Sequence, residues 1–397
     1  MSGALNGIKV LGFTHFAQGP FALQLMGDMG AEVINIERPG TGDFNRHVAP
    51  EEKLGGEGPF FLAMNRNKKG ITLNLKDPKA KEIVYKLIKE SDVVVSNYRA
   101  GALDKLGLGY EDAKKINPNI IYCEAVGYGS SGPYVKLPGQ DLLAQALSGY
   151  ANFCGTEGTP ASGGIYVVDM YSSLMLVIGV QAALLNVKNG GKGQKVEVNL
   201  LSSALHMQSQ ELCYYMNTGK MPAKSKDYTG HPLQEAPYGL YKTANGWMAM
   251  AINAGQDMKR FCEIIGLPEL AEQMPDKATM LRDKEKLHAQ IAPQIEKKDT
   301  EYWIEQFQAD GFWVAKVNDY EDVMKDPQVI YNQIIRTLHH PVAGDIKVVI
   351  APIEFSETPV EIRCAPPVLG QDNKEVLKEL GYTEEEIDAI KETGVLG

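Results

Sequence analysis

Short apolar runs alternate with helical segments over the first 130 residues. The helical segments run from Gly19 to Met29 and from Asp77 to about Glu90, where Asp77 followed by proline is a recognised helix start. Strands are predicted at 7–14, 31–37, 70–75, 92–98 and 119–128, and the last two are apolar runs of strand length, as in strands that are buried on both faces. This alternation predicts an α/β fold with a parallel sheet and helices on both of its faces.

The later part of the chain is predicted to be more mixed. A helical stretch begins at Asp141 and reaches Gly155, and a polar, turn-rich segment at 217–237 is predicted to be a linker. A hairpin follows at 238–253, with Asn245-Gly246 at its turn. The remaining predictions are a strand at 195–200, helices near 256–265, 299–309 and 320–325, a strand at 346–355 and a helix at 372–380.

Composition narrows the class of protein. The 397 residues are 44% hydrophobic and 23% charged, which suits a globular protein of two or three domains. The net charge of −10 and the lack of a Lys/Arg run do not favour a nucleic-acid partner, so an anionic ligand would need local cations. An odd number of cysteines, five, without a C-x-x-C, and an N-terminus without signal-peptide features indicate a reduced, cytoplasmic setting.

The 18 residues at 170–187 carry no charge and are nearly long enough to span a bilayer. Polar residues within the run, among them Gln181 and Asn186, and the predicted strands around it favour a helix buried in the core, with no membrane partner. Asp169 precedes this run directly. Its carboxylate could cap the helix, which the local residues favour, or act as a nucleophile held ionised by the helix dipole.

The first strand-to-helix turn, at 14–22, has the position of a dinucleotide-binding turn. Glu37 lies 18 residues after Gly19, close to where an acidic ribose-binding residue would sit. The turn has a single glycine followed by proline, so the glycine fingerprint is missing and an NAD enzyme is only weakly supported. A structural turn and a helix N-terminus that offers free N–H groups to an anion remain equally open.

Cationic and aromatic residues follow several predicted strands. Arg38 comes after the second strand and Asn97-Tyr98-Arg99 after the fourth, where open α/β sheets bind ligands. With Lys76 and Lys105 nearby, this set suits a phosphorylated, adenine-bearing ligand, although each lysine alone is better explained as a solvated surface residue. The seven histidines form no pair at metal-ligand spacing, and His339-His340 would point to opposite faces of a strand, so no metal site is predicted.

Taken together, these segments resemble the family III CoA-transferases, the group that includes formyl-CoA and carnitine CoA-transferases. The resemblance covers almost the whole chain, and the order and spacing of its pieces are specific. Its pieces are Asp169 itself and the segments 5–20, 27–43, 65–76, 97–107, 127–150, 191–200 and 365–382.

The resemblance implies that Asp169 is the catalytic nucleophile. Its carboxylate would attack the acyl-CoA thioester, giving a mixed anhydride and then an aspartyl-CoA thioester that the acceptor acid attacks. Backbone N–H groups of the 16–19 turn would bind the oxyanions. Asp141 matches a position that carries a carboxylate in the formyl-CoA enzymes, and Gln140 precedes it in the same segment. No permanently bound cofactor is implied, since CoA or acyl-CoA is a substrate.

The resemblance also implies binding positions and an architecture. A Rossmann-like large domain would be formed by both chain ends, 1–216 and 329–397, around a smaller central α+β domain at 238–328, and two subunits would interlock as a homodimer. The turn that meets the pantetheine end would be His15, Phe16 and Ala17. The other CoA-contacting positions would be Arg38, Leu73, Lys76, Asn97, Tyr98, Ala102 and Lys105.

Three departures argue against formyl-CoA and oxalate as the substrate pair. Ala17 stands where those enzymes carry a polar amide, Lys105 where an arginine is usual, and no glycine tetrad follows the linker. Small dicarboxylates, branched acids, aryl acids and betaines stay open as substrates.

Two other functions compete with transfer. An α-methylacyl-CoA racemase would need a histidine base where this chain has Gln140, and a primary amide cannot act as a base near neutral pH. A non-catalytic acyl-CoA-binding protein would keep Arg38 and Asn97 but would have no reason to retain Asp169.

Overall fold

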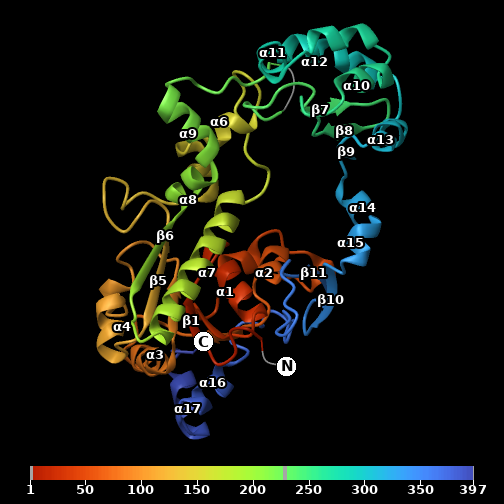
Figure 1. The fold of residues 1–397 in the computed structure, drawn as a ribbon. Helices are drawn as coiled ribbons and strands as arrows, with labels where there is room; N and C mark the ends of the chain where they lie inside the picture. Colours follow the sequence, from red (N-terminus) through yellow and green to blue (C-terminus); the bar gives the residue numbers. More distant parts are fainter. Residues whose placement is uncertain (1–2, 227–229, 397) are drawn as a thin grey trace. The chain divides into compact units, whose positions relative to one another are not determined.

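All five segments predicted as strands in the first 130 residues belong to one parallel sheet. This is seen in the computed structural model of the chain, which describes residues 3–226 and 230–396. With the strand after residue 194 they form six strands: β1 (Lys9–Phe13), β2 (Glu32–Glu37), β3 (Lys69–Thr72), β4 (Val93–Ser96), β5 (Ile121–Val126) and β6 (Lys195–Asn199). Their order across the sheet is β3-β2-β1-β4-β5-β6, so the prediction of an α/β fold with a large parallel sheet is confirmed (Figure 1).

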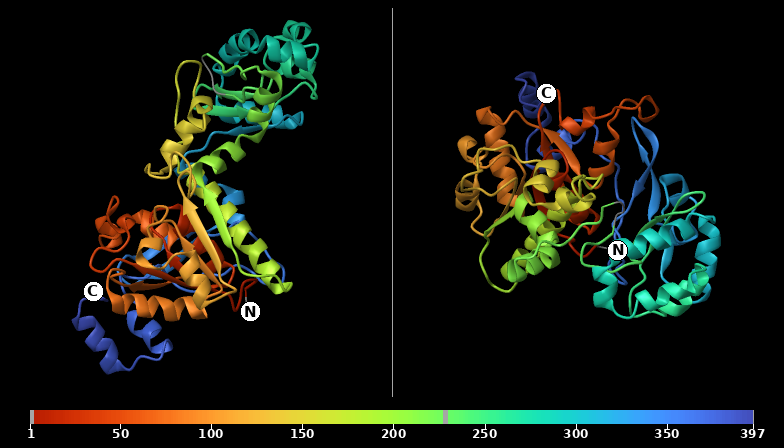
Figure 2. Two further views of the ribbon diagram at one scale, coloured as in Figure 1. Left: turned by 90° about the vertical axis from the view of Figure 1, so that its left-hand side faces the viewer. Right: turned by 90° about the horizontal axis from the view of Figure 1, so that it is seen from above.

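Helices cover both faces of this sheet (Figure 2). The side chains of β1 alternate: Leu11 and Phe13 belong to one buried cluster, whereas Val10 belongs to another. The first cluster includes α3 (Pro78–Glu90), α16 (Asn373–Glu379) and α17 (Glu384–Glu392), and the second includes α1 (Gln18–Asp28) and α7 (Val167–Lys188). Residues from both ends of the chain therefore share one core.

The order of the strands fixes where a ligand can bind. The chain runs from β1 to β2 and β3 on one side, then crosses to β4, β5 and β6 on the other. In open α/β sheets the crevice lies at such a reversal, outside the carboxyl ends of the two central strands. Here those ends are Phe13 of β1 and Ser96 of β4, which are paired in register.

The chain divides into two units, each with its own core. The first comprises Met1–Ala144, Tyr166–Met207 and Gln328–Gly397, and the second comprises Gln145–Ile165 and Gln208–Pro327. The division puts residues 145–165 and the predicted linker in the second unit, although residues 227–229 of that linker lie outside the described residues.

The other elements of the first unit are shorter or lie at its edge. The strand predicted at 346–355 is confirmed for residues 346–349, which belong to an antiparallel pair, and is wrong beyond Val349, where the chain leaves that pair. These elements are η1 (Phe44–His47), η2 (Glu52–Leu54), α2 (Pro59–Met64), η3 (Asp104–Leu106), α4 (Tyr110–Ile116), α5 (Asp141–Leu147), α8 (Leu200–Met207), α15 (Pro327–Tyr331), β10 (Ile335–His340) and β11 (Gly344–Val349).

The second unit packs helices on a small antiparallel sheet. Its core includes Tyr241, Phe261 and Phe307, and the predicted hairpin and the helices near 256, 299 and 320 are present. Its elements are α6 (Tyr150–Cys154), α9 (Ser209–Thr218), β7 (Gly239–Lys242), β8 (Trp247–Met250), α10 (Met258–Ile264), η4 (Pro268–Gln273), α11 (Lys277–Arg282), α12 (Lys284–Ile295), α13 (Thr300–Ala309), β9 (Val314–Lys316) and α14 (Tyr320–Val323).

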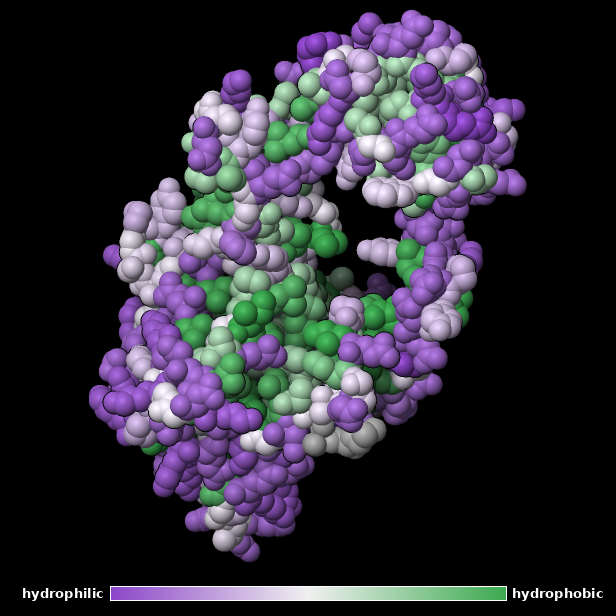
Figure 3. Space-filling model, in the orientation of Figure 1, coloured by the Kyte–Doolittle hydropathy of each residue, from purple (hydrophilic) through white to green (hydrophobic). Residues whose placement is uncertain are grey.

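The apolar helix α7 differs from its prediction in burial. It is long and apolar enough to cross a membrane by composition alone, but it packs on α1, β5 and β6 as a core helix does. Only one side is covered within the chain. The side chains of Leu174, Ile178 and Leu185 are 45%, 55% and 58% exposed, and Figure 3 shows hydrophobic surface over α7 and α8. The prediction of a helix buried in the core is therefore correct for one face and wrong for the other.

Candidate active site

A cavity of about 540 Å³ lies in the first unit, at the carboxyl ends of the central strands. The turn after β1 contributes His15, Phe16, Ala17 and Gln18, and the segment after β4 contributes Asn97 to Ala100. Further lining comes from the end of β5, from the loop that reaches Gln140, and from the start of α7 with Asp169. The remaining lining residues are Phe44, Asn45, Val48, Phe60, Leu143 and Leu200. The cavity therefore occupies the crevice that the strand order predicts.

Asp169 lies in the first turn of α7 but does not cap it. The N–H groups of Val168 and Asp169 donate to Oδ2 of Asp141, at 2.8 and 2.9 Å, and the N-cap residue Tyr166 makes no side-chain cap. Asp141, which is buried at the start of α5, therefore neutralises the free amides of the helix start. The interpretation of Asp169 as a helix cap is wrong, and its carboxylate is left available to the cavity.

The surroundings of Asp169 favour its protonated form. Burial and, to a smaller extent, the negative charge of Asp141 together raise the pKa of this carboxyl to about 7. Within residues 3–226 and 230–396 no donor is hydrogen-bonded to the Asp169 carboxylate oxygens. A carboxylate that is poorly solvated and unpaired is a stronger nucleophile than a salt-bridged one, provided that it is ionised.

The turn after β1 brings His15 and Phe16 into the cavity. Burial lowers the pKa of the His15 ring, which favours its neutral form, and its Nδ1 atom is buried without a hydrogen-bond partner. The ring packs edge-on against Tyr98, with centroids 5.2 Å apart, and burial raises the pKa of that tyrosine. Gly19 lets α1 start here, because a Cβ atom would lie 2.6 Å from Thr14 and 3.1 Å from Asn97.

The predicted positions separate into two groups. Seven of them line the cavity, and Asp141 touches the backbone of one of these. Five others do not line it: Arg38, Lys76 and Lys105 are exposed, Ala102 is half-buried and Leu73 is in the core. The three cations follow β2, β3 and β4, and these strands run parallel to β1 in the same sheet, so the cations stand outside the same edge of the sheet as Asp169. The cavity residues are His15, Phe16, Ala17, Asn97, Tyr98, Gln140 and Asp169.

The residues after β2 form an ionic network that the sequence analysis did not predict. Arg46 donates to both carboxylate oxygens of Glu37, at 2.9 and 2.8 Å, and Asp43 N–H donates to Oε2 of Glu37. Glu37 is thereby fully engaged and buried, which removes the acidic ribose-binding residue that a dinucleotide site would need. The sequence does place three charged residues, Glu37, Asp43 and Arg46, within ten positions at the end of a strand. Which of them pair depends on the fold and could not be predicted.

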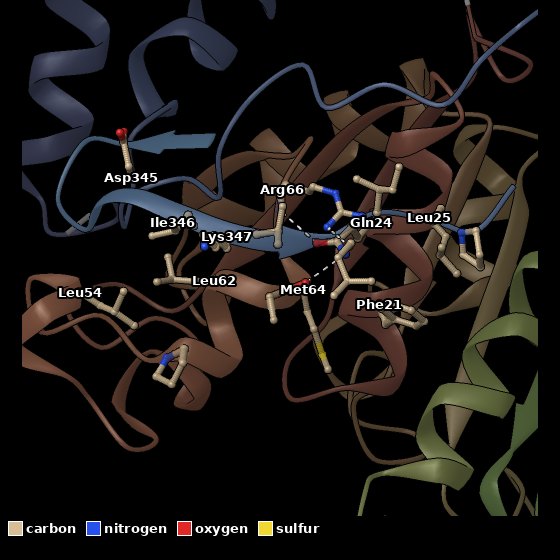
Figure 4. Close-up of a pocket in the computed structure, with 17 residues that line it drawn as sticks. Phe21, Gln24, Leu25, Leu54, Leu62, Met64, Arg66, Asp345, Ile346 and Lys347 are labelled. Carbon is tan, nitrogen blue, oxygen red and sulfur yellow. Dashed lines mark hydrogen bonds between the residues drawn. The ribbon is translucent and has the colours of Figure 1, made fainter. Parts of the chain in front are cut away.

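A second cavity of about 530 Å³ in the same unit is lined by α1, α2 and β11 (Figure 4). Its buried ion pair is complete. Arg66 donates to both oxygens of Asp28 and, through Nη1, to the carbonyl of Val349. Gln24 donates to Ala63 O and accepts the N–H of Arg66. The buried polar side chains of this cavity, Gln24 and Arg66, are therefore satisfied by the protein itself.

The described residues contain no cluster of side chains suited to bind a metal ion. Over residues 3–226 and 230–396, no group of three or more His, Cys, Asp or Glu side chains is arranged to hold a metal ion. The chemistry that the first cavity can perform is that of an unpaired carboxylate beside free backbone N–H groups, which suits acyl transfer.

Comparison with known proteins identifies the family of the chain. The family model of CoA-transferase family III matches residues 5–373. Succinyl-CoA:glutarate CoA-transferase from Homo sapiens is 35% identical over 396 residues, which cover 99% of this chain and 90% of that protein. Formyl-CoA:oxalate CoA-transferase from Streptomyces coelicolor is 31% identical, with 99% of each chain covered.

A solved structure gives the same result for the fold. A CAIB/BAIF family protein from Brucella suis superposes with a TM-score of 0.83 at 27% identity, covering 96% of this chain and all of that one. The family match spans both units and includes every residue that lines the cavity around Asp169. The chain belongs to CoA-transferase family III.

Proposed function

We propose that this enzyme moves CoA from an acyl-CoA donor to a carboxylic acid through covalent intermediates on Asp169. The observation that carries the proposal is the unpaired carboxylate of Asp169, which has a pKa of about 7 and lies in a cavity at the carboxyl ends of β1 and β4. The family match and the CoA-transferase names of the relatives support the reaction class.

The reaction balances as two exchanges. The Asp169 carboxylate attacks the thioester carbonyl, expelling CoA thiolate and forming an aspartyl anhydride. The thiolate then attacks the aspartyl carbonyl, which releases the donor acid with one former Asp169 oxygen and leaves an aspartyl-CoA thioester. The acceptor carboxylate attacks this thioester, and the returning thiolate takes the acceptor acyl group and restores the carboxylate of Asp169.

The residues around Asp169 have separate parts in this scheme. Asp141 holds the start of α7 and keeps the Asp169 proton affinity high. Asn97 and Tyr98 lie on the CoA side of the cavity by the family resemblance, with Arg38, Lys76 and Lys105 placed to meet phosphates. Free N–H groups in the turn before α1 meet the oxyanion of each tetrahedral intermediate.

The names of the relatives support a choice of substrates to test. Succinyl-CoA is named in those that act on glutarate and on mesaconate, so succinyl-CoA is the first donor to test, with short dicarboxylic acids as acceptors.

Oxygen labelling tests the anhydride route directly. With an acceptor acid carrying ¹⁸O in both carboxylate oxygens, each turnover leaves one ¹⁸O on Asp169, and the next donor acid released carries it away half of the time. Mass spectrometry of the released acid is expected to show this label. A released acid that stays unlabelled throughout many turnovers would overturn the covalent route while leaving CoA transfer itself intact.

We propose further that two copies form the interlocked homodimer implied by the family resemblance. The exposed apolar side of α7, with Leu174, Ile178 and Leu185, supports a second copy as its cover (Figure 3). Light scattering is expected to give twice the 43.5 kDa of one chain, and Ile178→Glu to reduce that mass. A monomer at micromolar concentration would contradict the proposal.

A further inference from the structure

The turn that enters the cavity after β1 has a backbone conformation that a large side chain rarely adopts. Phe16 has φ of +61°, in the left-handed region, although it is neither glycine nor asparagine. Such a conformation persists only where the surrounding structure holds it in place, and it is found most often at functional sites. The question is therefore which groups hold this turn.

Side chains bind the first two peptide groups of the turn. The N–H of Thr14 donates to Oδ1 of Asn35, and Nδ2 of Asn35 donates back to Thr14 O. The N–H of His15 donates to Oδ1 of Asn97 at 3.0 Å, and Nδ2 of Asn97 donates to His15 O at 2.6 Å. Asn35 lies in β2 and Asn97 follows β4, the two strands that pair with β1. Their side-chain amides therefore hold the backbone just after β1, where the backbone pairing of the strands has ended.

The third peptide group, that of Phe16, is held by a carboxylate and an amide. Its N–H donates to Oδ1 of Asp43 at 3.3 Å, and its carbonyl accepts from Nδ2 of Asn45 at 2.6 Å. The same Asp43 oxygen accepts the N–H of Asn45 at 2.9 Å. We call Asn35, Asn97, Asp43 and Asn45 the side-chain clamp.

Asp43 is itself fixed by the network after β2. Its side chain is 4% exposed, and its N–H donates to Glu37, which is bound by Arg46. The clamp thus connects the strained turn to a rigid ion pair rather than to solvent. An ionised carboxylate at position 43 costs stability, since burial raises the pKa of Asp43 to about 6. A neutral amide could accept the same hydrogen bonds, but the chain has an aspartate here.

The clamp ends where free donors begin. After Phe16, the N–H groups of Ala17, Gln18 and Gly19 have no acceptor among residues 3–226 and 230–396. Oγ of Ser173 lies 2.7 Å from both Gln18 O and Asp169 O, so the start of α1 is joined to the backbone of the nucleophile. The cavity there also contains buried side-chain atoms without partners, Nε2 of Gln18 and Oδ1 of Asn45, which indicates that a polar ligand completes the site.

We infer that Asp43 is a positioning residue of the transfer reaction, which holds the Phe16 peptide so that the next free N–H groups face the oxyanion formed at Asp169. The inference rests on the proposed covalent function. Asp43 does not line the cavity, so it acts through the turn and not by touching the substrate. Donors that are fixed before reaction stabilise the transition state without reorganisation, and a small displacement lowers the rate strongly.

The test compares Asp43→Ala with Asp43→Asn in the full-length enzyme. Rapid-quench mass spectrometry follows the appearance of CoA on the Asp169 peptide against succinyl-CoA concentration, without an acceptor. Asp43→Ala is expected to lower the limiting rate about 100-fold, with the half-saturating concentration changed less than about threefold. Asp43→Asn is expected to stay within about tenfold of wild type, because its Oδ1 can accept the same bonds.

Asp372→Ala is the matched control. Its carboxylate also accepts a backbone N–H, that of Gly70 at 2.6 Å, but it lies outside the cavity, so its variant should keep the limiting rate. If Asp43→Ala does not fold, Asn45→Ala releases the Phe16 carbonyl from the other side and should lower the limiting rate about tenfold.

Two results would overturn the inference. One is a wild-type limiting rate in folded Asp43→Ala, or in folded Asn45→Ala if Asp43→Ala does not fold. The other is an effect on half-saturation alone, which would make Asp43 a binding residue. If the CoA adduct forms in wild type, and at the same rate in these Asp43 and Asn45 variants, only this inference is refuted. No adduct in wild type with any donor refutes the proposed function instead.

Discussion

Two cavities of the first unit have nearly the same volume, about 540 and 530 Å³, but differ in whether their charged side chains are paired. At the second, Asp28 and Arg66 neutralise each other, and all three guanidinium nitrogens of Arg66 donate. At the first, Asp169 has no cationic partner among the described residues and has Asp141 beside it. Volume alone would not distinguish them.

The difference lies in what each cavity still requires. Around Arg66 the protein completes its own hydrogen bonds, which is the condition for a stable buried pair. Around Asp169, Nδ1 of His15 and Nε2 of Gln18 are buried without partners, and no donor among the described residues is hydrogen-bonded to the Asp169 carboxylate. Unsatisfied buried groups cost stability, so their concentration in one cavity marks the place where a substrate supplies the missing partners.

The largest expected effect is the loss of transfer in Asp169→Ala. Without the nucleophile the covalent route is closed, and the rate of CoA exchange should fall at least about 10⁴-fold. Calorimetry should show that CoA still binds, because the residues predicted to contact it are unchanged. Exchange at more than a tenth of the wild-type rate would place the nucleophile elsewhere.

The second cavity should respond in the opposite way. Arg66→Met leaves Asp28 as an uncompensated buried charge, which is expected to cost about 3–5 kcal/mol of unfolding free energy. The exchange rate per folded molecule should stay within about threefold. Arg260→Met is the matched control, because its pair with Asp310 is at the surface and its removal should change denaturant stability far less. A catalytic defect without a loss of stability in Arg66→Met would reverse the two assignments.

Asp169→Asn should stabilise the folded protein while it inactivates the enzyme. The folded pKa of about 7 lies above the ordinary value of 3.8, so the folded state binds the proton more tightly than the unfolded chain. Ionisation of Asp169 therefore lowers the stability of the wild-type protein. This loss is complete above pH 7 and absent below about pH 4. Urea unfolding at pH 8 is expected to show a gain of about 1–3 kcal/mol, and none at pH 4. A gain that is equal at both pH values would show that ionisation is not its cause.

A smaller shift is expected from Asp141→Asn. Removal of this charge lowers the pKa of Asp169, while the asparagine oxygen can still accept the helix N–H groups. The acid limb of the adduct-forming rate, near pH 7 in wild type, should move down by about 1 pH unit. Asp77→Asn, which changes the corresponding cap of α3, should leave the limb in place. A limb unchanged in Asp141→Asn would assign the titration to another group.

The smallest expected effect is that of Gln140→His. The histidine gives the cavity one base, but a racemase needs a second base on the other side of the α-carbon and a pocket that exposes the α-proton. Deuterium exchange at the α-carbon of a 2-methylacyl-CoA in heavy water should stay at the background rate. Exchange above background would show that the chain retains the rest of a racemase site.

The sequence was sufficient for the sheet and for the selection of Asp169 as a candidate, but not for the side chains that hold the site between them. Parallel strands are apolar throughout because both faces are covered, so runs such as that ending at Phe13 are readily recognised. Asp169 was suggested by its place before an apolar helix and by the family resemblance. Its capping interpretation failed because the actual cap, Asp141, is 28 residues away and is brought there by the fold.

Other differences have similar physical causes. Helices α11 and α12 were not predicted, since their sequence is polar and Pro293 interrupts its pattern. The exposed side of α7 could not be recognised, because an apolar run shows that a face avoids water and not which molecule covers it. The clamp at Phe16 depends on Asp43 and Asn97, whose contacts across 27 and 82 positions leave no local periodicity.

The central claim is that Asp169 carries the CoA group, and the most direct measurement is peptide mass spectrometry after incubation with a panel of acyl-CoA donors and no acceptor. The account predicts a CoA adduct on the peptide that contains Asp169, absent in Asp169→Ala. No adduct with any donor, in a sample that exchanges CoA once an acceptor is added, would contradict it.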